Sequence, residues 1–194
     1  MATTSSAPRE LPWTNDEQAN RLLASDPNAL LIGFVLDQQV TVQKAFAGPL
    51  ALSQRLGHLD PAAIASLDPE QLSQVFRAKP ALHRYPAAMA QRVQALCATL
   101  TEEYGGDGSR VWREAATGDD LVARLGALPG IGDMKVRSLT ATLVKQFGVK
   151  PDGWKRVLPG HPTLGDVDSA EALAEYQAHK RAYKQQARAL RGRT

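Results

Sequence analysis

Apolar residues recur along most of this chain at the three-to-four-residue spacing that places them on one face of an α-helix. Residues that favour strands are not gathered into alternating runs. The pattern therefore predicts an all-α protein of about eight to ten helices. The segment from Asn28 to Gln39 is apolar on nearly every side, which is typical of a buried central helix.

Capping signals and prolines mark where several of these helices begin. Thr14 and Glu17 have the spacing of a capping box, which predicts a short helix from there to about Ala24. Asp-Pro pairs place an N-cap before a proline at the first helical position and predict further starts at residues 26, 60 and 68. The other predicted helices begin near Thr41 or span 86–104, 109–115, 119–127, 133–147 and 169–190, with a Pro- and Gly-rich stretch at 150–165.

Composition excludes several classes of protein. The chain has 194 residues, 43% of them hydrophobic, which suits one domain or a compact two-lobed one. The longest apolar run, 29–36, is far shorter than the roughly 20 residues of a membrane helix, and residues 1–10 lack the apolar core of a secretory signal. The single cysteine, Cys97, excludes a disulfide framework, a Cys-based zinc site and an iron–sulfur cluster within one chain. We therefore expect a cytoplasmic protein with no membrane partner.

Positive charge is concentrated at the end of the chain. The net charge is only +3, but no acidic residue follows Glu175, while six basic residues do: Lys180, Arg181, Lys184, Arg188, Arg191 and Arg193. The segment is either a solvated helix end with a basic tail or a surface that follows the phosphates of nucleic acid. Three of the four histidines, at 58, 161 and 179, have no companions at the spacing of metal ligands, so no zinc site is expected.

The most informative motif is Leu-Pro-Gly-Ile-Gly at 128–132, between two predicted helices. Two glycines around one apolar residue favour a tight turn, with Ile131 packed between the helices. The backbone amides from Gly130 through Gly132 then lie at the N-terminus of the next helix, where amides and helix dipole favour a phosphate. Lys135, one turn on, adds a positive charge. The motif predicts a helix–hairpin–helix that holds DNA by its backbone rather than by its bases, although a purely structural turn between helices has the same pattern.

The hairpin motif resembles that of the HhH-GPD superfamily of base excision DNA glycosylases. Residues 31–39 are similar to the superfamily's helix that ends in Ser-Gln-Gln. More closely, the strings Leu-Asp-Gln-Gln-Val, Lys-Pro-Ala-Leu-His-Arg-Tyr-Pro and Phe-Gly-Val-Lys-Pro-Asp-Gly-Trp resemble a group of small HhH-GPD-type proteins. The resemblance covers roughly residues 28–160.

The resemblance implies a two-lobed all-α HhH-GPD fold. Residues 1–14 are expected to be a flexible leader. Residues 27–147 would form a helical bundle that ends in the helix–hairpin–helix at about 119–147. Residues 15–26 and 148–194 would form the second lobe, with the flipped base in the cleft between the two lobes.

The resemblance also implies candidate catalytic residues. The superfamily keeps an aspartate after the second hairpin helix, near the sugar, where a carboxylate stabilises an oxocarbenium-like transition state. Asp152 is the best match, with Asp166 and Asp168 as alternatives. Gly153 and Trp154 replace the residues that usually follow, and Asp152-Gly153 is also a common turn dipeptide.

Further positions carry over from the superfamily. Met134 stands where bifunctional members have their Schiff-base lysine, and Lys135 is one position later, so no β-lyase activity is expected. Gln38 matches the glutamine that enters the gap left by the flipped nucleotide, and Gln39 is expected to support it; helix-end hydrogen bonding is the alternative. Asp37 stands where serine is usual, and lining the lesion pocket, binding a cation and capping a helix all stay open.

Two aromatic residues and a set of backbone carbonyls complete the candidate site. Trp154 and Tyr85 are candidates for the lesion pocket, although core packing and surface capping are their ordinary roles. The superfamily's hairpin often holds a monovalent cation, K⁺ or Na⁺, through backbone carbonyls, which by position would be those of Gly126, Leu128 and Ile131. No other cofactor is expected.

These observations predict a base excision repair protein that binds damaged double-stranded DNA as a monomer, close to the nucleoid. The predicted activity is that of a monofunctional DNA glycosylase, with alkylated purines as the expected substrates. One alternative is a non-catalytic helix–hairpin–helix module that recognises duplex or damaged DNA. Another is a helical protein whose hairpin contacts protein.

Overall fold

The computed structural model describes residues 8–191, and within that range the chain is all-α, as predicted. It has one isolated bridge, between Thr117 and Asp152, and no strand in the described part. No helix in this range is long and apolar enough to cross a membrane. The helices are α1 (Glu17–Ser25), α2 (Pro27–Leu36), α3 (Val42–Leu56), α4 (Pro61–Ser66), α5 (Pro69–Arg77), α6 (Pro86–Tyr104), α7 (Arg110–Arg113), α8 (Gly118–Ala127), α9 (Asp133–Lys145) and α10 (Ala170–Arg191), with short 3-10 helices η1 (Trp154–Val157) and η2 (Leu164–Asp166).

The core is built around α2, in which every residue from 29 to 36 is buried. The Asp26 carboxylate caps its start by accepting from the amides of Asn28 and Ala29, at 2.8 and 3.2 Å. Helices α1, α3 and α6 pack around it. The rings of Trp13, Phe34 and Phe46 meet edge to face, with centroids 4.8 to 6.0 Å apart.

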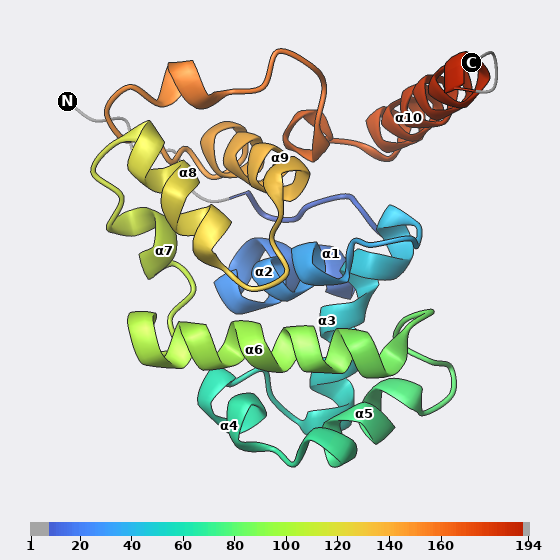
Figure 1. Cartoon of the computed structure of the whole chain (residues 1–194), viewed down its shortest axis with the longest axis vertical. Helices are drawn as coiled ribbons and strands as arrows, with labels where there is room; N and C mark the ends of the chain where they lie inside the picture. Colours follow the sequence, from blue (N-terminus) through green and yellow to red (C-terminus); the bar gives the residue numbers. More distant parts are fainter. Residues whose placement is uncertain (1–7, 192–194) are drawn as a thin grey trace.

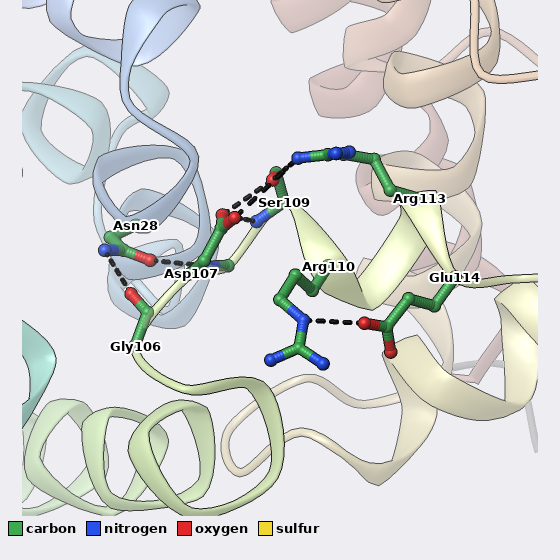
Figure 2. Close-up of polar contacts among 8 residues, drawn as sticks. Asn28, Gly106, Asp107, Ser109, Arg110, Arg113 and Glu114 are labelled. Atoms are coloured by element: carbon green, nitrogen blue, oxygen red, sulfur yellow. Dashed lines mark hydrogen bonds and ion pairs between the residues drawn. The ribbon is translucent and has the colours of Figure 1, made fainter.

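A polar cluster fixes the N-terminal end of α2 to the segment between α6 and α7. The Asn28 side chain donates to Gly106 O at 3.0 Å and accepts from Gly108 N at 2.9 Å (Figure 2). The Asp107 carboxylate accepts from the hydroxyl and amide of Ser109. The hydroxyl hydrogen bond is the largest cause that holds the pKa of Asp107 below its ordinary value. These contacts close a loop whose backbone polar groups would otherwise need water.

Helix α6 crosses the middle of the molecule (Figure 1). Helices α4 and α5 pack against one side of it and α2 against another. Beyond α2 lie α8 and α9, which pack against each other, and η2 packs against α9. Helix α10 starts beside η2 and extends away from the body (Figure 1). The division into two lobes stays a prediction.

Three predicted boundaries need correction. The predicted leader includes Leu11 and Trp13, but both are fully buried, because Trp13 packs on α2 and α3 and its indole N–H donates to Val167 O at 3.3 Å. Residues 1–7 lie outside the described range. The N-cap of α1 is Asp16 rather than Thr14, whose hydroxyl donates instead to Asn20. Helix α2 ends at Leu36, so the segment 37–39 lies outside it.

The contact between η2 and α9 leaves no room for a side chain at Gly165. A Cβ there would lie 2.5 Å from the Ala141 carbonyl carbon and 2.6 Å from the Thr142 amide nitrogen. Both neighbours are helix backbone, so neither can move without distorting α9. A Cβ at Gly160 would meet nothing within 4 Å.

We therefore expect Gly165→Ala to lower the free energy of unfolding by about 2 kcal/mol, because overpacking against backbone forces the two elements apart. In a chain of this size that lowers the melting temperature by about 4–8 °C. Thermal unfolding followed by circular dichroism measures the effect, with Gly160→Ala as the matched control. Equal melting temperatures for the two variants would contradict the close packing of η2 on α9.

Candidate functional site

The turn between α8 and α9 forms the predicted tight hairpin. Gly130 has φ +81°, and a Cβ there would lie 3.2 Å from the side chain of Val35 on α2. Ile131 is buried, and its amide donates to Leu128 O at 3.1 Å. Gly132 is the N-cap of α9, and it and the first residues of that helix are exposed. The hairpin thus packs one side on α2 and presents the N-terminus of α9 to solvent, a geometry suited to an anion.

Lys135 faces into the molecule rather than toward this exposed helix end. Its ammonium donates to Val35 O and to Gly130 O, both at 3.0 Å. Burial lowers the pKa of Lys135, and the nearby charge of Asp37 opposes that shift. The predicted role of Lys135, an added charge for a bound phosphate, is therefore replaced by a bond between the hairpin and the end of α2. The Leu128 carbonyl, one of the predicted cation ligands, accepts from Ile131, and the cation site itself stays a prediction.

A cleft of about 630 Å³ opens beside the hairpin. Its walls come from the end of α2, the segment after it, the first turns of α9 and the middle of α10. The lining residues are Phe34, Asp37, Gln39, Val40, Thr41, Met134, Lys135, Ser138, Tyr176 and Lys180. Volumes of this size hold small organic ligands.

The two glutamines after Asp37 face different ways. The Gln38 side chain accepts from Arg92 on α6, and Gln38 does not line the cleft. Gln39 does line it, with φ 56° and its side-chain oxygen accepting from the Tyr85 hydroxyl at 3.1 Å. Of the two, Gln39 therefore lies nearer to a ligand in the cleft, whereas the motif had suggested Gln38.

Tyr85 and Met134 are the two large hydrophobic side chains exposed in the described part of the chain, at 41% and 69%. Tyr85 contacts Gln39, and Met134 lines the cleft directly. Met134 therefore presents exposed apolar surface in the cleft, and Tyr85 presents it next to the cleft residue Gln39.

His83 is hydrogen-bonded to the segment 37–39. Its ring is buried; Nε2 lies 3.0 Å from Gln38 O, and Nδ1 accepts from the Tyr85 amide at 3.0 Å. Because Nδ1 is an acceptor, the ring proton resides on Nε2, which donates to Gln38. Burial lowers the pKa of His83, so the ring is neutral at physiological pH. Lys44 and Arg55 secure the loop that carries it, by donating to Ala81 O and Pro80 O, each at 2.7 Å.

Asp152 lies in a different place. It is exposed in a separate hollow of about 310 Å³ formed by residues 150–156. Its backbone bonds to the start of α8, with its amide donating to Ala116 O and its carbonyl accepting from Gly118 N. Trp154 shares this hollow, with the ammonium groups of Lys150 and Lys155 at 5.4 and 5.7 Å from its ring centroid. Neither Asp152 nor Trp154 lines the cleft beside the hairpin.

The alternative aspartates also lie outside that cleft. Asp166 accepts from the Thr163 amide at 2.9 Å and pairs with Lys145, so it caps η2. Asp168 is exposed before α10. Among the residues that line the cleft, Asp37 is the one carboxylate.

The motifs did not identify Tyr176 and Lys180 as part of the cleft. Both come from α10, far along the chain from α2. Tyr176 is half-buried, and burial raises the pKa of its hydroxyl. The basic run after Glu175 was the one signal in this region, and it did not show that α10 lines the same cleft as the end of α2. Within residues 8–191, no group of three His, Cys, Asp or Glu side chains could hold a metal ion.

Comparison with known proteins agrees with the hairpin geometry. The family model described as HhH-GPD superfamily base excision DNA repair protein matches residues 32–192. This range includes the hairpin and every residue that lines the cleft. No match is found among curated proteins or among solved structures.

His83 generates a prediction about pH. In the folded protein its pKa is lowered, so below about pH 6.5 the unfolded chain binds a proton that the folded chain does not. Stability is therefore expected to fall as the pH drops through this window, by at most about 1.4 kcal/mol per pH unit from this one group.

Chemical denaturation at about pH 7.5 and pH 5.5 measures this slope. His83→Gln is the control, because it keeps an N–H donor for Gln38 O and does not titrate. A slope as steep in the variant as in the unaltered protein would contradict the assignment.

Proposed function

Because the chain belongs to the HhH-GPD superfamily of base excision DNA repair proteins, we propose that it is a DNA glycosylase that hydrolyses the N-glycosidic bond of a damaged base. The observation that carries the proposal is the cleft directly beside the hairpin, with Met134 and Lys135 of α9 in its wall. A glycosylase must turn its target base out of the duplex into a pocket, since the reacting carbon is inaccessible within the stack. A cleft of about 630 Å³ has room for a purine.

Two features support binding of double-stranded DNA. The exposed N-terminus of α9 offers amides and a positive helix end to one phosphate. Lys180 lines the cleft from α10, and Arg181 beside it is exposed. Lysine and arginine side chains that neutralise phosphates release counterions, so this binding weakens steeply with salt. We propose that one copy of the chain binds one damaged site.

The residues of the cleft favour a monofunctional enzyme. A lyase needs a neutral amine that attacks the sugar, but Met134 occupies the position of that lysine. The Lys135 nitrogen is engaged by two backbone carbonyls. Alkylated purines are the proposed substrates because a base alkylated on a ring nitrogen leaves easily and needs little help from the protein.

The second candidate is a non-catalytic module that binds duplex or damaged DNA. It is favoured by the position of Asp152, whose hollow is separate from the cleft. Such a protein keeps the hairpin and its salt-sensitive binding but releases no base.

We expect base release from at least one member of a panel of duplexes that each carry one lesion: uracil, hypoxanthine, 8-oxoguanine, 3-methyladenine or 7-methylguanine. Cleavage of the product by hot alkali reports the abasic site. We expect no strand cleavage without alkali and no covalent complex after borohydride reduction, because Met134 occupies the position of the attacking lysine and the Lys135 nitrogen is engaged by two carbonyls. Absence of release from every duplex, with salt-sensitive binding intact, would favour the non-catalytic module.

We expect Lys180→Gln to weaken binding to duplexes of any sequence and to reduce the slope of log affinity against log salt by about one. Arg77→Gln is the control, because Arg77 is an exposed arginine on α5 that pairs with Glu70 and does not line the cleft. Fluorescence anisotropy between about 50 and 200 mM salt measures both slopes. An unchanged slope for Lys180→Gln would place the DNA away from α10.

A further inference from the structure

The cleft beside the hairpin has its own carboxylate, and it is not the aspartate that follows the hairpin helix. Asp37 lines the cleft, while Asp152 is exposed in a separate hollow whose backbone is bonded to the start of α8. In a cleft that takes a flipped nucleotide, the sugar carbon enters together with the base. A carboxylate acts on that carbon only if it reaches the same cavity.

The backbone on both sides of Asp37 fixes its position. Its amide donates to Gly33 O at 3.0 Å and to Phe34 O at 3.3 Å, which closes the last turn of α2. The next residue, Gln38, is held through its carbonyl by His83 and through its side chain by Arg92. A carboxylate whose position is fixed before the reaction begins does not have to reorganise when charge develops near it.

Asp37 lines the cleft between groups of two other helices. Burial lowers the pKa of Lys135 on α9, and the Asp37 charge opposes that shift; burial raises the pKa of the Tyr176 hydroxyl on α10, and the Asp37 charge adds to it. Asp37 therefore lies close to a group on each of two other helices. The Lys135 ammonium donates to Val35 O and Gly130 O.

We infer that Asp37, rather than Asp152, is the catalytic carboxylate of this chain. The inference rests on the proposed function. When the bond between C1′ and the base nitrogen breaks, its electron pair leaves with the base, and positive charge develops on C1′ and the ring oxygen. Asp37 stabilises that charge. Water then forms a bond to C1′ and gives its proton to Asp37, which releases it to solvent. A purine alkylated on a ring nitrogen leaves as a neutral base, so the step needs no proton donor.

The test uses binding rather than turnover, because transition-state mimics report on this charge without a known lesion. One duplex carries a pyrrolidine abasic nucleotide, which is cationic where the sugar becomes positive. Its control carries a neutral tetrahydrofuran abasic nucleotide. The unaltered protein should bind the cationic duplex about tenfold or more tighter than the neutral one. Asp37→Asn should reduce this preference to within about twofold, and Asp152→Asn should leave it unchanged.

Affinity for the neutral duplex is the control for folding, and it should be the same in all three proteins. Thermal unfolding is measured on each; if Asp37→Asn does not fold, Asp37→Ser and Asp37→Glu replace it, and only the glutamate variant should keep the preference. Each of three results would overturn the inference: the preference persists in folded Asp37→Asn, the preference is lost in Asp152→Asn, or the unaltered protein shows no preference.

The lesion panel separates this outcome from failure of the proposed function. Once the panel has identified a substrate, Asp37→Asn should slow single-turnover base release by about 100-fold or more and leave the affinity for the product duplex unchanged. Release that depends on Asp152 instead would overturn the inference and leave a glycosylase. Absence of release from every duplex would overturn the proposed function itself.

Discussion

The Lys135 ammonium is the contact on which the site depends, because it joins two backbone carbonyls that lie far apart in the sequence. Val35 O belongs to the last turn of α2, where the carbonyls of a helix lack partners within the helix. Gly130 O belongs to the hairpin. A single side chain thus satisfies both and sets the distance between the central helix and the hairpin. Without this side chain, two backbone carbonyls would lose their partner, at a cost of about 1–3 kcal/mol each where they stay buried.

Burial of α2 determines where its end, and so the cleft, lies. A helix that is apolar on all sides is packed by neighbours on every face, which fixes its position in the core. The point at which the chain leaves the core after Leu36 is therefore fixed as well. The chain turns there through Gln39, which adopts the left-handed conformation at φ 56°. Such a conformation persists only where neighbours hold it. His83 and Tyr85 provide that support from a loop that Lys44 and Arg55 fix to α3.

Local signals predicted much of this structure. The buried helix, the Asp-Pro helix starts and the Leu-Pro-Gly-Ile-Gly turn depend on residues close in sequence, and the structure has all three. The prediction of a flexible leader was wrong at Leu11 and Trp13. Their burial depends on contacts with α2, α3 and Val167, which no local pattern shows.

The candidate site could be predicted only in part, for the same reason. The resemblance to the superfamily pointed to Asp152 but could not show that the backbone of this residue bonds to the start of α8. Lys135 was expected to face a phosphate, but its ammonium bonds to two backbone carbonyls. Helical spacing gives the direction of a side chain but not the groups that it will contact. Tyr176 reaches the cleft through the path of α10, which depends on η2 and not on any motif.

The N-terminus of α9 and the C-terminus of α2 lie on either side of Lys135 and carry partial charges of opposite sign. The N-terminus of α9 carries a partial positive charge and opens to solvent, where a DNA phosphate would lie. The C-terminus of α2 carries a partial negative charge and leads into Asp37, which lines the cleft. An anionic backbone and a sugar that becomes cationic are therefore each favoured on their own side of the hairpin. A carboxylate at the end of α2 acts together with that helix dipole, whereas Asp152, in a hollow of its own, gains nothing from it.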